Sequence, residues 1–286
     1  MNILPKILLQ IDKKQEISLF LKFLNHPEFP NHRKTILQVF PELRESLENS
    51  KNDDGAVSDF IDRFYLKHEA AISSAIQNGK EEMKGSQGAL KALGESMDYH
   101  WHKNISYIAM PTILPFSPFN KNTFYFSILS QVLKEDKKSA LLVAIHEISH
   151  FIFFEILEEI EKTEKISLAP DTKYYLKEAL TTALFNEEPL REELKIDDYL
   201  GNPEIRDIYL KDRADSVKNI VDYIRERYVE NKKNSGNFKE FLTKLMLLFN
   251  RVSDEFLRKR RIWNQWGKEL FKNESGLANY RQPIKL

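Results

Sequence analysis

"LLVAIHEISHFIFFEIL", residues 141–157, is the most apolar stretch of the chain, yet two histidines and a glutamate stand at its centre. Apolar residues occupy nearly every side of a helix drawn through this stretch, so the helix is expected to run through the middle of a core. Ser139 stands where it can cap the amino terminus of that helix. The sequence therefore predicts a central core helix with one polar face.

The spacing of the two histidines predicts a metal site. His146 and His150 are four residues apart, so their imidazoles project from one helix face about a turn apart. The chain has no cysteine, so a metal must be held by histidine and carboxylate, and Zn²⁺ accepts such ligands while keeping a position open for water. Glu147 can take a proton from that water as general base. The opposing interpretation is one histidine hydrogen-bonded inside a core and Glu147 facing a helix end.

A third ligand decides the class of zinc site. The HExxHxxGxxH form is excluded because Phe153 and Ile156 stand where it needs glycine and histidine. Glu178 opens the string "EALTTAL", residues 178–184, in the next predicted helix. With this string and HExxH, the chain resembles the gluzincins, the thermolysin-like zinc peptidases, whose third ligand opens a similar string. The resemblance implies that His146, His150 and Glu178 hold one Zn²⁺ ion.

The resemblance covers only residues 99–188 and departs from the gluzincin pattern at one position. Gluzincins commonly place an acidic residue four positions after the third ligand, where it supports a metal histidine, and here that position is Thr182. The residue that orients the metal-binding histidine must therefore stand at another position in the chain. The alternative for Glu178 is a glutamate on a helix surface, and Glu187 and Glu188 are the reserve ligands.

Gluzincin-type peptidases also stabilise the oxyanion with a tyrosine or histidine from outside the HExxH helix. Tyr209, in a helix expected after the "GNPE" loop, is the catalytic candidate, and His100 and His102 are the others. For each of the three, the alternative is a side chain that only packs.

The rest of the chain reads as helices with one short β region. Residues 1–97 are expected to form an N-terminal helical region, and residues 98–286 a zincin-like metallopeptidase domain with C-terminal helices. "ISYIAM" (105–110) and "TFYFSIL" (123–129) are rich in β-branched and aromatic residues and predict two strands. Further helices are expected over 172–187, along an apolar stripe from Ile205 to Ile224, along a second stripe from Phe238 to Phe249, and from Ser253 to near Phe271.

The fold class expected from these features is α+β and predominantly helical, with a zincin-like catalytic core that holds a small sheet and is flanked by helical regions.

Composition limits the partners. Forty-three basic residues balance forty-three acidic ones, so no global charge favours nucleic acid or an anionic membrane. The run "RKRR", Arg258–Arg261, is expected to form a solvated helix face opposite a packed stripe. The amino terminus shows no signal peptide, and residues 141–157 have no second long apolar run to join them in a membrane. A cytoplasmic protein with no membrane span and a peptide or protein substrate is expected; the oligomeric state stays open.

The leading functional hypothesis is a zinc-dependent metallopeptidase, a hydrolase in which Glu147 activates the attacking water. The alternative is a non-catalytic helical interaction or regulatory protein that retains a zincin scaffold.

Overall fold

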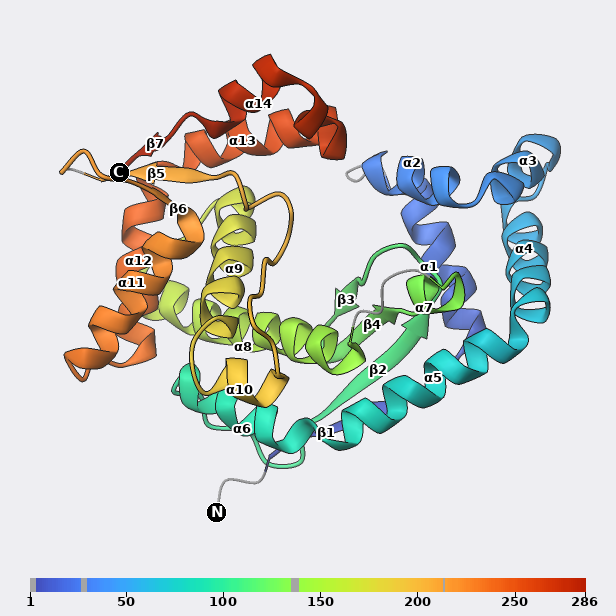
Figure 1. The fold of residues 1–286 in the computed structure, drawn as a ribbon, viewed down its shortest axis with the longest axis horizontal. Helices are drawn as coiled ribbons and strands as arrows, with labels where there is room; N and C mark the ends of the chain where they lie inside the picture. Colours follow the sequence, from blue (N-terminus) through green and yellow to red (C-terminus); the bar gives the residue numbers. More distant parts are fainter. Residues whose placement is uncertain (1–3, 27–29, 135–138, 213) are drawn as a thin grey trace. The chain divides into compact units, whose positions relative to one another are not determined.

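A computed structural model describes residues 4–26, 30–134, 139–212 and 214–286. The chain forms two compact units. The first consists of residues up to 87 together with 101–148, and the second of 88–100 together with 149–286 (Figure 1). The N-terminal region of residues 1–97 and the domain of residues 98–286 stay predictions.

A four-stranded sheet lies in the first unit. Its strands are β1 (Lys6–Leu9), β2 (Ser106–Thr112), β3 (Phe119–Asn120) and β4 (Thr123–Ser127), in the order β1-β2-β4-β3. Strands β1 and β4 each pair with β2 in parallel, and β3 pairs with β4 antiparallel. The two strands predicted from the sequence are confirmed as β2 and β4. Strand β1 was not predicted, because four residues after a proline are too short for a periodic pattern, and the N-terminal region is therefore not helical alone.

Helices cover the rest of the first unit. They are α1 (Lys13–Asn25), α2 (Pro30–Val39), α3 (Pro41–Asn49), α4 (Asp53–Lys67), α5 (Glu69–Lys84) and the short α7 (Leu129–Val132). Four phenylalanine rings join α1, α4 and the loop before α3, with centroids 5.1 to 6.2 Å apart: Phe20, Phe40, Phe60 and Phe64. This aromatic cluster is the core of the helical part of the unit.

Helix α8 (Ala140–Glu164) contains the apolar stretch of residues 141–157. The predicted cap is confirmed, because the Ser139 hydroxyl accepts a hydrogen bond from Leu142 N at 3.3 Å. The helix is long and apolar enough to cross a membrane, and 56% of its apolar window is buried inside the protein; one such helix is weak evidence for a membrane span. It is continuous through the division between the two units, which falls after Ile148.

The second unit is built around α9. Its helices are α6 (Ser86–Ser96, most of which falls here), α9 (Pro170–Phe185), α10 (Leu190–Leu194), α11 (Ile220–Lys233), α12 (Phe238–Asn250), α13 (Ser253–Trp266), the 3₁₀ helix η1 (Gly267–Lys272) and α14 (Glu274–Arg281). Helix α9 packs against α11 and α13. Every residue of α9 from Tyr175 to Phe185 is buried, so no face of this segment is solvated. The predicted helix over 172–187 is confirmed.

Three sequence interpretations in the second unit were wrong. The stripe from Ile205 to Ile224 is not one helix, because β5 (Tyr209–Lys211) and β6 (Val217–Asn219) form an antiparallel pair before α11 begins. Strand β7 (Ile284–Lys285) joins the other edge of β5. The helix from Ser253 ends at Trp266, since Gly267 adopts a left-handed φ of +54°.

The third wrong interpretation concerns the run "RKRR", Arg258–Arg261, whose side chains do not form a wholly solvated helix face. Lys259 is fully buried, and its ammonium donates to the backbone carbonyls of Tyr280 and Gln282.

Candidate metal centre

Three side chains that can hold a metal gather on α8 and α9. One ligand atom from each of His146, His150 and Glu178 lies within 4.8 Å of the others. The two histidines are one turn apart on the continuous helix α8, so helix geometry sets their spacing. Glu178 comes from the middle of α9, and its Oε1 lies 3.5 Å from His150 Nε2. Residues far apart in the sequence thus form a group that could hold a metal ion.

The burial of the group differs from one member to the next. His150 and Glu178 are buried, with 1% and 6% of their surface exposed, whereas His146 is half-buried. The alternative that Glu178 is a helix-surface glutamate is therefore excluded. Glu147, the residue expected to act as base, is 5% exposed. Burying carboxylates costs free energy unless a cation or hydrogen-bond donors stand close by.

The electrostatic surroundings keep His150 neutral. Burial, and after it the nearby Lys177 ammonium, lowers the pKa of His150 to about 4, while Glu178 acts in the opposite direction. A neutral imidazole keeps a nitrogen lone pair, which is the form that ligates a metal.

Thr181 orients the His150 ring. Its Oγ1 lies 3.3 Å from His150 Nδ1 and 2.8 Å from the hydroxyl oxygen of Ser149. When Nδ1 carries the proton and donates to Thr181, Nε2 is left with its lone pair toward Glu178. The Thr181 hydroxyl is thus a neighbour of the His150 nitrogen that points away from Glu178.

Thr182, the position that departs from the gluzincin pattern, has another role. Its hydroxyl donates to the carbonyl oxygen of Glu178 at 2.8 Å. Gly201, with a φ of +61°, lies so close that a Cβ built on it would be 2.1 Å from Thr182 Oγ1. Thr182 therefore fixes how the loop before β5 lies on α9.

Sequence reasoning missed both Thr181 and Lys177. Lys177 is 7% exposed, and its ammonium donates to Glu178 Oε1. One signal was present in the sequence, since Thr181 follows Glu178 by three residues and so lies near it on a helix. For Lys177 the sequence held no signal, because its burial depends on other helices covering every side of α9.

The secondary candidates lie elsewhere in their units. Tyr209 is in strand β5, not in a helix, and lines a surface hollow together with Glu187 and Arg225. The carboxylate of Glu187 pairs there with Arg225, and Glu188 pairs with Arg191 at 2.8 Å. His100 and His102 are both exposed. The role of Tyr209 in catalysis stays a prediction that none of these contacts supports.

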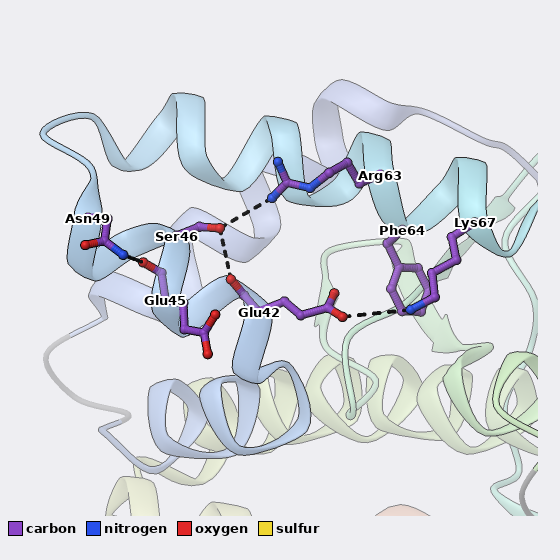
Figure 2. Close-up of a pocket in the computed structure, with 7 residues that line it drawn as sticks. All are labelled: Glu42, Glu45, Ser46, Asn49, Arg63, Phe64 and Lys67. Atoms are coloured by element: carbon purple, nitrogen blue, oxygen red, sulfur yellow. Dashed lines mark hydrogen bonds and ion pairs between the residues drawn. The ribbon is translucent and has the colours of Figure 1, made fainter.

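The surface hollows described in the two units are lined by residues other than the metal group. One of them lies between α3 and α4, where Lys67 approaches Glu42 at 3.8 Å and Arg63 donates to the Ser46 hydroxyl (Figure 2). Lys67 and Arg63 of α4 thus each meet a polar side chain of α3. The hollow adds nothing to the metal chemistry.

Comparison of the chain with protein-family models, curated proteins and solved structures finds no match. The resemblance to gluzincins therefore rests on the residues of the motif alone.

Proposed function

We propose that the protein is a zinc-dependent metallopeptidase in which His146, His150 and Glu178 hold one Zn²⁺ ion. The observation that carries the proposal is the convergence of these three ligand atoms, two from α8 and one from α9, within 4.8 Å. Two imidazoles and one carboxylate are a common ligand set of catalytic zinc.

The distance inside the group is compatible with zinc. Ligand atoms bound tetrahedrally to one Zn²⁺ ion are about 3.4 Å apart, since each bond is close to 2.0 to 2.1 Å. The His150 Nε2 to Glu178 Oε1 distance of 3.5 Å agrees with this. A zinc ion in such a site supplies a Lewis acid that makes water a nucleophile near neutral pH.

The chain's own residues supply the remaining chemistry. Glu147 follows His146 directly, and its carboxylate is buried. It would take the proton of the attacking water and deliver it to the leaving amine. Thr181 would keep the His150 ring in the ligating tautomer.

Zinc content and hydrolysis, measured on the same set of variants, test the proposal. The wild-type chain dialysed against Zn²⁺ should retain about one equivalent by atomic absorption and cleave an unfolded protein such as casein. His150→Ala should lose the zinc, and Glu147→Gln should keep the zinc but lose hydrolysis. Saturating zinc at about 1,000 times its Kd should stabilise the wild type by about 4 kcal/mol. Zinc unaffected by His146→Ala would disprove the site.

Burial favours one alternative, a metal site in a non-catalytic interaction or regulatory protein. Glu147, His150 and Glu178 are each less than 10% exposed, and only His146 in this group is half-buried. A closed metal site stabilises a fold without reaching a substrate. In that case zinc would bind and raise the unfolding temperature. His150→Ala would lose the zinc and Glu147→Gln would keep it, as in a metallopeptidase, but no peptide would be cleaved.

A further inference from the structure

A buried lysine stands beside the candidate ligand Glu178. Lys177 precedes it in α9, is 7% exposed, and donates from Nζ to Glu178 Oε1. The same carboxylate oxygen lies 3.5 Å from His150 Nε2. In the proposed metal site a divalent cation would approach the same oxygen as this ammonium, and the metal chemistry itself does not require the ammonium.

The ammonium has a second partner one turn earlier on α9. Lys177 Nζ lies 5.2 Å from the centroid of the Tyr174 ring, at a distance where an aromatic face attracts a cation. Tyr174 is fixed in place, since its hydroxyl donates to Glu204 at 2.9 Å and accepts from Asn202 at 2.7 Å. Lys177 can thus move away from the carboxylate without losing every favourable contact.

Charge explains why a lysine is needed in a metal-free chain. Glu178 is buried, and an ionised buried carboxylate without a counter-charge costs several kcal/mol. A divalent ion could supply that counter-charge, but it must then meet the positive charge already present. The two cations are alternatives at one oxygen.

We infer that Lys177 is the counter-cation of Glu178 in the metal-free protein, and that a divalent metal binds by displacing its ammonium from Glu178 Oε1. This inference rests on the proposed metal site. Lys177 acts here as a positioning residue, which keeps the carboxylate in place before the metal arrives and lowers the affinity for the metal. The metal would then dissociate more readily than from the same two histidines and carboxylate without the lysine.

Zinc affinity of the Lys177→Met variant tests the inference, because methionine keeps the apolar stem and removes the charge. We expect Zn²⁺ to bind at least tenfold more tightly in competition with a chromophoric chelator, a difference of about 1.4 kcal/mol. The metal-free variant should unfold at a lower temperature than wild type. A lysine with a merely structural role would lower the unfolding temperature without tightening zinc binding, so an equal or weaker affinity overturns the inference.

Lys173→Met is the matched control. Lys173 lies one turn earlier on α9 and pairs with Glu161 at 2.8 Å, so this variant also removes one positive charge and one ion pair from the helix. Its zinc affinity should equal that of the wild type. An equally large gain in Lys173→Met would show a general charge effect and overturn the specific role of Lys177.

Two further measurements separate the possible failures. If Lys177→Met does not fold, wild-type protein labelled with ¹⁵N at lysine replaces it: Zn²⁺ should shift the ammonium resonance that Lys177→Arg removes, and no shift overturns the inference. His150→Ala tests the site itself. If His150→Ala loses zinc while Lys177→Met binds it as the wild type does, only the counter-cation role fails; if His150→Ala keeps zinc, the proposed metal site fails.

Discussion

Two buried carboxylates of the second unit, Glu204 and Glu178, meet opposite surroundings. Glu204, 1% exposed, accepts hydrogen bonds from Tyr174 at 2.9 Å and Tyr175 at 2.7 Å and pairs with the Arg260 guanidinium. Burial raises the pKa of Glu204, and Arg260 acts against that rise. These neighbours are all hydrogen-bond donors, so the chain itself stabilises this carboxylate.

Glu178 has a donor on one side and a potential ligand on the other. Lys177 donates to it, while Nε2 of His150 lies 3.5 Å from its Oε1 and presents a lone pair when the imidazole proton is on Nδ1. A metal ion would join these two atoms if both are acceptors, as the proposed site requires; with the imidazole proton on Nε2 instead, His150 would donate to the carboxylate. The comparison teaches that the identity of the neighbours, not the burial of an acid, distinguishes a candidate ligand from a structural residue.

Removing the guanidinium beside Glu204 should have the largest effect. Arg260→Met leaves a buried carboxylate without its cation, and we expect the free energy of unfolding to fall by about 3–5 kcal/mol. Urea unfolding measures this. Arg258→Met is the control on the same helix, since Arg258 meets Glu255 and Asn279 at a half-exposed site and should cost at most about 1 kcal/mol. Equal losses in the two variants would mean that Glu204 does not depend on Arg260.

A third buried carboxylate, Glu16 in the first unit, extends the comparison to a site where hydrogen-bond donors, and no cation from the part of the chain that the structure describes, contact the acid. Glu16, 3% exposed, accepts from the Thr112 hydroxyl at 3.0 Å and Ile113 N at 2.8 Å. Burial raises its pKa to about 7, and the two hydrogen bonds act against that rise. In the unfolded chain the pKa of the Glu16 carboxyl group is lower, about 4.5. The contribution of Glu16 to the free energy of unfolding is therefore fully present below pH 4.5 and is lost as pH rises through 7.

The wild type should therefore lose about 3 kcal/mol of unfolding free energy through this group between pH 4.5 and pH 8. Glu16→Gln stays neutral and should lack this contribution, which urea unfolding at the two pH values would reveal. Glu45→Gln, at an exposed position, is the control and should follow the wild-type curve. A Glu16→Gln curve parallel to that of the wild type would contradict the prediction.

Gly201→Ala should have a smaller effect, on the loop that packs on α9 one turn after Glu178. A methyl group there meets the Thr182 hydroxyl and is held at a left-handed φ of +61°, so we expect a loss of about 1–3 kcal/mol in thermal unfolding. Gly267→Ala is the matched control. Its φ is +54°, but nothing lies within 4 Å of the added carbon, so only the backbone cost applies. Losses of equal size would show that the contact with Thr182 is unimportant.

Thr181→Val should have the smallest effect on the metal site, and it also removes the buried hydrogen bond between Thr181 and the Ser149 hydroxyl. Without the hydroxyl, His150 Nδ1 loses the partner that orients the ring, and zinc affinity should fall about tenfold. Thr181→Ser keeps the hydroxyl and should bind zinc as the wild type does. Chelator competition measures both, and unchanged affinity in Thr181→Val would assign the orientation of His150 to other contacts.

Local patterns were predictable from the sequence where the element itself fixes the geometry. The four-residue spacing of His146 and His150 places them on one face of any helix, and the apolar residues around them require a buried helix. Ser139 was expected as a cap because capping depends only on neighbours in the chain.

Other features depend on pairing between distant segments. Strand β1 exists because β2 pairs with it, and Tyr209 lies in a strand because β6 and β7 flank β5. Four or three residues carry too little periodicity to predict either. The burial of Lys259 likewise depends on the carbonyls of Tyr280 and Gln282, which only the packing of α14 on α13 brings to it.

By itself the sequence determined a core helix with two histidines and a glutamate on its polar face, since helical periodicity is a local property. Only the tertiary structure decided that Glu178 reaches those histidines, that Thr181 rather than Thr182 touches His150, and that Lys177 lies on the same carboxylate. The physical reason is that α9 is buried on every side. On such a helix the hydrophobic pattern distinguishes no inner face, and the neighbouring helices alone determine what each polar side chain meets.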